Sequence, residues 1–172
     1  MAIEDDFWAQ PCEGLKGRYA PVSEASLRNK EKELGVTLPS QYRRLMQEQN
    51  GGDVRRSTYY DGKQYYQLFV NGGRLSPLDK VRPFTSILDY FMTNEEIEND
   101  KQSFDYCYPE RLIVISDLDG HGLVCMDYGW TLHNSVKVPA VVVFEQNHRS
   151  PFGYVEVLRV ADFEEFIGGL VY

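Results

Sequence analysis

The densest group of side chains that could do chemistry lies in one short segment. Asp117, Asp119 and His121 alternate around Gly120, and Asp127 follows a few residues later. Carboxylate oxygens are the ligands that Mg²⁺ and Ca²⁺ prefer, and a histidine beside them could act as a general base. A calcium-binding loop needs further ligands and a closing glutamate at fixed spacing, which this segment lacks. Aspartate and glycine between two apolar runs are the ordinary residues of a turn, so we favour a turn over a metal site.

The other histidines and the cysteines indicate no second site. His133 and His148 have no cysteine or histidine at the spacing that a zinc site needs. Cys107 and Cys125 lie beside or within apolar segments, which favours buried small side chains over nucleophiles. No glycine-rich phosphate loop and no G-x-S-x-G elbow occurs. We therefore predict no catalytic residue, no cofactor and no metal.

Composition limits the class of partner. The chain has 172 residues, 18 Lys and Arg against 26 Asp and Glu, and a net charge of −8. Such a chain is a poor general ligand for nucleic acid or for an anionic membrane surface. Its acidic start is unlike a signal peptide, no apolar run approaches the ~20 residues of a membrane span, and three cysteines suit a reducing compartment. We expect a cytoplasmic protein.

The elements that position these residues begin with an arm and a capped helix. Residues 1–22 mix glycine, proline and aromatic residues, which predicts an irregular arm whose aromatic rings pack on the domain. Ser23 can cap a helix over Glu24–Leu34, and Gly35 can end that helix in the left-handed conformation. Few apolar residues lie on this helix, so we expect it on the surface.

A second helix follows directly. Pro39 suits its first position, and Tyr42, Leu45 and Met46 form one apolar stripe at helical spacing. Asn50-Gly51-Gly52 is expected to end it, because these residues tolerate positive φ.

A tyrosine-rich hairpin comes next. Asp61-Gly62 is a turn dipeptide between two Tyr-Tyr pairs, and Gln67–Val70 continues the second strand in this prediction. Two interpretations of the tyrosines stay open, namely aromatic packing between the strands and an exposed surface for a partner protein. The tyrosines concerned are Tyr59, Tyr60, Tyr65 and Tyr66.

An acidic run follows in the middle of the chain. Thr93 and Glu96 form a capping box that predicts a helix over residues 94–102. Glu95, Glu96 and Glu98 would then give a solvated acidic face, which could also attract a basic protein.

The last third predicts a sheet and a closing helix. Apolar strands are expected over Leu112–Ser116, Leu123–Asp127 and Val138–Phe144, the last of them central, and an alternating strand over Tyr154–Arg159. Asp162 opens the final helix, whose predicted buried residues are Phe163, Phe166, Ile167 and Leu170. Helices, then strands, then a helix is an α+β order.

Four segments together resemble the SUKH superfamily. The first comprises Leu34-Gly35, Leu38-Pro39, Tyr42, Leu45 and Asn50-Gly51-Gly52. The second comprises Tyr108-Pro109, Leu112–Ile115, Gly120-His121 and Cys125–Tyr128, and the others are Val141–Glu145 and Asp162–Ile167. The resemblance runs over residues 24–170 and leaves residues 53–107 without a clear counterpart. It implies one α+β domain over residues 1–172, in which a mixed, mostly antiparallel sheet packs against helices.

The resemblance also suggests a function. The superfamily includes the yeast cell-wall synthesis regulator and many bacterial immunity proteins that bind and neutralise toxin domains, often nucleases. Our leading hypothesis is a non-catalytic immunity protein whose partner is a basic nuclease toxin. The alternatives are an intracellular regulatory or scaffold protein and a small-molecule-binding or hydrolytic domain that uses Asp119, His121 and Asp127. The predicted partner-binding residues are Tyr59, Tyr60, Tyr65, Glu95, Glu96 and Glu98, with Asp117, Asp119 and His121 as a second patch.

Overall fold

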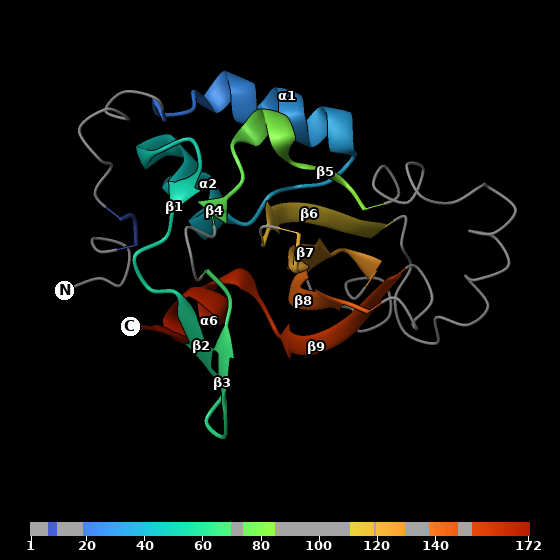
Figure 1. Ribbon diagram of the computed structural model, residues 1–172. Coiled ribbons are helices and arrows are strands. Elements are labelled where there is room, and N and C mark those ends of the chain that lie inside the picture. The colour runs from blue at the N-terminus through green and yellow to red at the C-terminus, as the bar shows by residue number, and fades with distance from the viewer. Residues whose placement is uncertain are drawn as a thin grey trace, which may run out of the picture. The chain divides into compact units, whose positions relative to one another are not determined.

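The computed structural model describes residues 7–9, 19–69, 74–84, 111–118, 120–129, 138–147 and 153–172. Figure 1 labels the helices and strands, and the contacts divide the chain into two compact units. Unit 1 comprises Met1–Lys80 and Phe163–Tyr172, and unit 2 comprises Val81–Asp162. Helices and antiparallel strands occupy separate stretches of the chain, so the predicted α+β class is confirmed. The single domain over residues 1–172 stays a prediction.

Helix α1 of unit 1 spans Glu24–Leu34, as predicted. The Ser23 hydroxyl accepts a hydrogen bond from the Ser26 N–H at 3.1 Å, and Gly35 ends the helix with φ of 67°. These two caps satisfy backbone groups that a helix leaves without internal partners. Leu27 is the buried residue of α1, so the helix lies on the surface of its unit as expected.

Helix α2 spans Ser40–Glu48 and buries the predicted stripe of Tyr42, Leu45 and Met46. The prediction for Pro39 was wrong by one position. Its ψ of 143° is extended, so Pro39 precedes the helix, although its carbonyl already accepts a hydrogen bond from the Arg43 N–H at 3.0 Å.

A cluster of charged side chains joins the two helices. Arg43 of α2 contacts Glu31 of α1 at 2.6 Å and also pairs with Glu24. Glu31 additionally accepts a hydrogen bond from the Leu38 N–H at 2.8 Å. The hydrogen bond from Arg43, with a second from Arg28, lowers the pKa of the Glu24 carboxyl. The cluster holds α1 against α2. It also ties α1 to the segment that connects the two helices, through the bond from Leu38.

Two small antiparallel sheets complete unit 1. Strand β1 (Gly52–Asp53) pairs with β4 (Arg74–Leu75), which the short helix η4 (Leu78–Lys80) follows. The other sheet has the order β10-β2-β3, with β10 over Leu170–Val171, β2 over Thr58–Tyr60 and β3 over Tyr65–Gln67.

The end of the chain corrects the predicted closing helix. Helix α6 spans Phe163–Gly168, and its buried residues include the predicted phenylalanines. Leu170 is buried as expected, but it lies in strand β10 (Leu170–Val171) opposite Tyr59 of β2. The helix ends because the chain turns there into the strand pairing with β2. The Gly169 carbonyl then accepts a hydrogen bond from the Tyr60 N–H at 2.9 Å.

The second strand of the hairpin is also shorter than predicted. Strand β3 ends at Gln67, because the N–H groups of Leu68 and Phe69 both donate to the Ser57 carbonyl at 2.9 Å and turn the chain.

Of the predicted arm, residues 7–9 are described. Phe7 is buried and Trp8 forms an isolated antiparallel bridge with Val54, so these aromatic residues pack on unit 1 as expected.

Unit 2 contains a five-stranded antiparallel sheet with the order β5-β6-β7-β8-β9. The strands are β5 (Arg82–Pro83), β6 (Leu112–Asp117), β7 (Gly122–Asp127), β8 (Ala140–Gln146) and β9 (Tyr154–Val160). Strand β7 is the middle strand, and β8, which the sequence predicted to be central, lies next to it on the β9 side. The β-branched residues of β8 are buried, as an interior strand requires.

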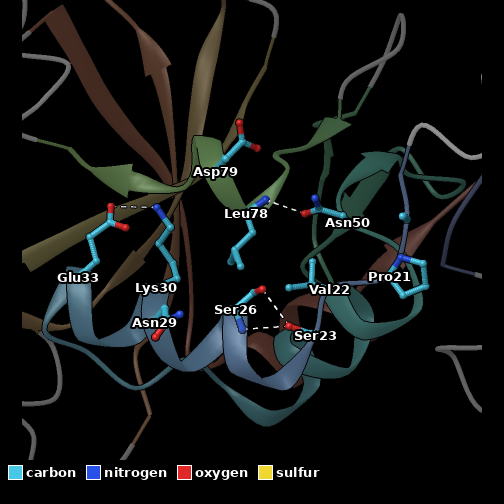
Figure 2. Close-up of a pocket in the computed structure, with 11 residues that line it drawn as sticks. Pro21, Val22, Ser23, Ser26, Asn29, Lys30, Glu33, Asn50, Leu78 and Asp79 are labelled. Carbon is cyan, nitrogen blue, oxygen red and sulfur yellow. Dashed lines mark hydrogen bonds and ion pairs between the residues drawn. The ribbon is translucent and has the colours of Figure 1, made fainter.

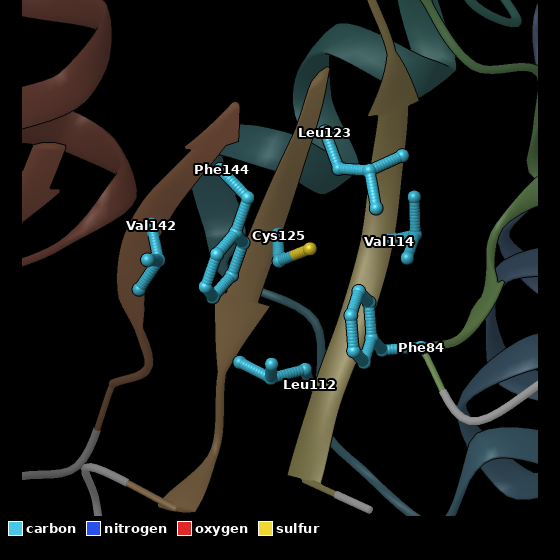
Figure 3. Close-up of a cluster of buried hydrophobic side chains, with 7 residues drawn as sticks. All are labelled: Phe84, Leu112, Val114, Leu123, Cys125, Val142 and Phe144. Atoms are coloured by element: carbon cyan, nitrogen blue, oxygen red, sulfur yellow. The ribbon is translucent and has the colours of Figure 1, made fainter. Parts of the chain in front are cut away.

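One face of this sheet carries a hydrophobic cluster (Figure 3). The rings of Phe84, which follows β5, and Phe144 of β8 stack with their centroids 5.8 Å apart, and Cys125 of β7 is buried in the same cluster. Cys125 is therefore the small buried side chain that the sequence predicted. The other members are Leu112, Val114, Leu123 and Val142.

Several predictions fall outside the described residues. These are the helix over residues 94–102 with Glu95, Glu96 and Glu98, and also Asp119, Cys12, Cys107, His133 and His148. Within the described part of the chain, no helix combines the length and the apolar character that a membrane span requires.

Candidate protein-binding surface

The β2–β3 hairpin of unit 1 presents two tyrosines to solvent. Tyr60 and Tyr65 lie opposite each other in the ladder, and their rings stack with centroids 4.6 Å apart and an interplanar angle of 26°. Their exposed fractions are 40% and 68%. This pair therefore packs across the strands, as the first interpretation predicts, and it is exposed to solvent, as the second requires. Contact with a partner protein stays a prediction.

Tyr59 lies on the opposite face of the same hairpin. It is 5% exposed, and its ring stacks on Phe166 of α6 with centroids 5.7 Å apart. Gly169 leaves room for this ring, since a Cβ at that position would lie 2.2 Å from it. Burial raises the pKa of the Tyr59 hydroxyl, and the nearby carboxylates of Glu165 and Asp61 raise it further. Tyr59 thus anchors the hairpin to unit 1, and Tyr60 and Tyr65 form its exposed face.

The hairpin turn is held by one carboxylate. Asp61 accepts hydrogen bonds from the backbone N–H groups of Gln64 at 2.8 Å and Lys63 at 2.7 Å, and from the Tyr66 hydroxyl at 3.1 Å. The two backbone bonds lower the pKa of Asp61, so it is charged at neutral pH. Gly62 supplies the positive φ of 90° that a two-residue hairpin turn needs. The exposed tyrosine pair therefore stands next to a fixed negative charge.

The predicted second patch lies in unit 2, in the turn between β6 and β7. The Asp117 carboxylate accepts a hydrogen bond from the Gly120 N–H at 3.0 Å, and the His121 N–H donates to the Leu118 carbonyl at 3.1 Å. Gly120 has the positive φ of 77° that this turn requires. The described residues of this segment therefore form a turn between the two strands, and both Asp117 and His121 are exposed there.

The third member of the predicted acid–base cluster lies elsewhere. Asp127 ends strand β7, and His121 directly precedes the start of that strand, so the length of β7 separates them. Asp127 is 1% exposed and pairs with Arg159 of β9 at 2.8 Å, and Arg159 also pairs with Glu156 at 2.8 Å. Burial lowers the pKa of Arg159, but its hydrogen bonds to Glu156 and Asp127 outweigh that effect and raise it. Asp127 therefore serves a buried ion-pair network, and the structure does not bring it to His121.

Within the described residues, no group of three or more histidine, cysteine, aspartate or glutamate side chains could hold a metal ion.

One open groove of about 730 Å³ lies along α1 in unit 1 (Figure 2). Lys30 and Glu33 of α1 form an ion pair at 2.9 Å in it, and on the other side the Leu78 N–H donates to the Asn50 side chain at 2.8 Å. This groove could not be predicted from the sequence, because its walls come from segments that are far apart in the chain.

Comparison with known families shows what the chain is similar to. The model of the SMI1 / KNR4 family (SUKH-1) matches residues 21–169, which is most of the chain. No curated protein matches the chain.

Proposed function

The chain belongs to the SMI1 / KNR4 family (SUKH-1), and from this membership we propose that it acts by binding another protein as an immunity protein. In this proposal the partner is a toxin domain of the nuclease class. The protein neutralises it stoichiometrically, by covering its active site or fixing its conformation, without turnover and without a cofactor.

The exposed Tyr60–Tyr65 pair is the observation that supports a protein partner. Tyrosine rings bury a large area and lose little conformational entropy, which is why protein interfaces are enriched in them. Here the two rings are already fixed against each other by stacking, and the hairpin below them is anchored through Tyr59. A partner that covers this face would therefore meet a preorganised surface.

Charge supports a basic partner. A nuclease needs a basic surface to hold phosphate, and this chain carries a net charge of −8. Opposite charges raise the association rate by roughly 10 to 10³, and the effect weakens as salt screens it.

We assign direct contact to Tyr60 and Tyr65 and a supporting role to Tyr59. Asp117 and His121 form the proposed second contact, because both are exposed on a turn that local hydrogen bonds fix. Glu95, Glu96, Glu98 and Asp119 remain predicted partner-binding residues outside the described part of the chain.

The test is a pull-down from lysate of the native cell at low and at high salt, followed by mass spectrometry and purification of what is bound. We expect one basic protein with nuclease activity, whose binding weakens with salt. Titration with this protein should abolish the nuclease activity at an equimolar end point. The double variant Tyr60→Ser/Tyr65→Ser should lose the partner. The matched control Val138→Ser/Val155→Ser, which removes two similarly exposed apolar side chains from unit 2, should retain it.

The alternative function gives a different outcome. If the bound proteins are regulators or enzymes of envelope synthesis, and no nuclease is inhibited, the immunity role is wrong. The regulatory or scaffold role then takes its place.

A further inference from the structure

The free edges of the sheets differ in how they are protected. A strand at the edge of a sheet exposes unpaired N–H and C=O groups, and proteins block such edges with charge, proline or a β-bulge. In unit 2, the edge strand β9 has a register shift opposite Val143 and Phe144 that leaves Val157 as an extra residue. It also carries the charged Glu156 and Arg159, and the other edge strand, β5, contains Pro83. Both edges of the five-stranded sheet are thus blocked.

Strand β3 of unit 1 has none of these devices. Its residues Tyr65, Tyr66 and Gln67 include no charge and no proline, and its pairing with β2 has no register shift. It ends the order β10-β2-β3, so no described strand pairs with its outer edge.

The hydrogen bonds of the hairpin show which groups point outward from β3. The Asp61 N–H donates to the Gln64 carbonyl, and the Leu68 N–H donates to the Ser57 carbonyl. In an antiparallel ladder, every second pair of opposite residues is hydrogen-bonded. Asp61–Gln64 and Ser57–Leu68 are bonded pairs, so the pair midway between them, Tyr59–Tyr66, is bonded as well. The pairs Tyr60–Tyr65 and Thr58–Gln67 are the non-bonded pairs of this ladder.

The N–H of Tyr60 fits this alternation, because it turns away from β3 and donates to Gly169. By the same alternation, the N–H and C=O groups of Tyr65 and Gln67 point to the free edge of β3.

The surroundings of this edge favour positive charge. Asp61 is a carboxylate fixed by hydrogen bonds at the adjacent turn, and Lys63 in the same turn offsets part of its charge. The exposed faces of Tyr60 and Tyr65 attract an ammonium or guanidinium group through their ring electrons.

We propose that β3 accepts an extended, positively charged segment of the partner protein as a fourth strand of the β10-β2-β3 sheet. The inference rests on the proposed function and specifies how the partner is held. Backbone bonds to Tyr65 and Gln67 provide the register, and lysine or arginine side chains at alternate positions lie over the Tyr60–Tyr65 pair. This is recognition by strand addition, in which the backbone contributes affinity and alternate side chains contribute specificity.

The test does not need the natural partner. A phage-displayed library of random linear peptides is selected on the full chain, and selected peptides are synthesised for binding measurements. We expect enrichment of lysine and arginine at alternate positions among β-branched residues. On the wild-type protein, a bound peptide should slow amide hydrogen exchange at Tyr65 and Gln67 more than at Tyr66, which already donates within the hairpin.

A proline variant isolates the backbone contact. Gln67→Pro removes an N–H that the hairpin does not use and places a ring on the free edge, so it should weaken peptide binding about tenfold or more. Gln67→Thr, which retains the N–H and suits a strand, should bind within about threefold of wild type. Circular dichroism of both variants checks the fold, and the exchange measurement on the wild type is independent of whether Gln67→Pro folds.

Three outcomes would overturn strand addition. They are selected peptides without basic residues, unchanged exchange at Tyr65 and Gln67, and full affinity in a folded Gln67→Pro protein. If a purified nuclease is still bound and inhibited by Gln67→Pro, the proposed function stands and strand addition is wrong. If no nuclease is found but the peptide results hold, the proposed function fails and β3 remains a binding edge.

Discussion

Replacing Arg159 by methionine tests whether Asp127 depends on a cation for its burial. Asp127 is 1% exposed at the end of β7, and the Arg159 guanidinium lies 2.8 Å from its carboxylate. Methionine replaces the aliphatic stem of the arginine without its charged guanidinium. The variant therefore leaves a buried carboxylate without this guanidinium.

The magnitude follows from the burial of the two side chains. Breaking a buried ion pair by removing one partner costs about 3–5 kcal/mol, because the remaining charge is not solvated. The Arg159 side chain is 20% exposed, so water can partly replace it and we expect the lower end, about 3 kcal/mol. In an Asp127→Asn background only the partly buried pair with Glu156 is broken, and Arg159→Met should cost about 1 kcal/mol. The coupling energy between the two positions is then about 2 kcal/mol.

The assay is urea unfolding of the wild type, both single variants and the double variant. Amide exchange of β7, β8 and β9 is measured alongside it, so that loss of unit 2 is distinguished from loss of unit 1. A cost below about 1 kcal/mol in both backgrounds would mean that the Asp127 carboxylate is solvated when Arg159 is removed. The reasoning from burial would then be refuted.

Three further predictions concern unit 1. Gly35→Ala should cost about 1 kcal/mol in urea unfolding for its positive φ. Gly51 has a similar φ, but a Cβ there would lie 2.6 Å from the Pro77 backbone nitrogen, so Gly51→Ala should cost about 2–4 kcal/mol. Equal losses of unfolding free energy in the two variants would contradict this close packing at Gly51. Because the folded protein has a lowered pKa at Glu24, its bond to Arg43 contributes stability above about pH 4.5 that is lost as pH falls. Glu24→Gln should reduce the fall of the urea midpoint at acidic pH. If the midpoint falls as steeply in the variant as in the wild type, the Arg43 contact does not stabilise the fold. The raised pKa of Tyr59 means that its ionisation opposes folding above about pH 10. An ultraviolet titration should therefore show a fraction of the tyrosines that ionises at higher pH than the rest, and this fraction should be smaller in Tyr59→Phe. An equal fraction in both proteins would mean that the Tyr59 ring is solvated.

Features with local causes could be predicted from the sequence. Helix α1 has its predicted bounds because Ser23 and Gly35 act on adjacent backbone groups. Strands β6, β7 and β8 follow from apolar runs between turn residues and β9 follows from alternation, whereas β5 was not predicted. Pro39 was misplaced because the proline ring fixes φ but leaves ψ open, and ψ decides whether the residue is helical.

Features that depend on distant residues could not be predicted in the same way. Leu170 has the spacing of a helical core residue, and only its pairing with Tyr59 makes it a strand residue. Alternation predicted that some hairpin tyrosines face outward, but the packing of Phe166 and Gly169 on Tyr59 decides which ones. The pairing of Asp127 with Arg159 was also missed, because the two lie on strands that β8 separates.

The order of segments in unit 1 has a consequence for the time at which this unit can form during synthesis. Strand β2 is made early, but its partner β10 and the helix α6 that covers Tyr59 follow after the whole of unit 2. During synthesis, the tyrosine hairpin is therefore made before α6 and β10, which hold it in unit 1. Unit 2 has all its described strands in one continuous stretch of the chain and can fold first. Closing unit 1 then requires contacts of large sequence separation, which slow folding. A hairpin that becomes fixed only at this step presents its exposed tyrosine pair after unit 2 and helix α6 have been made.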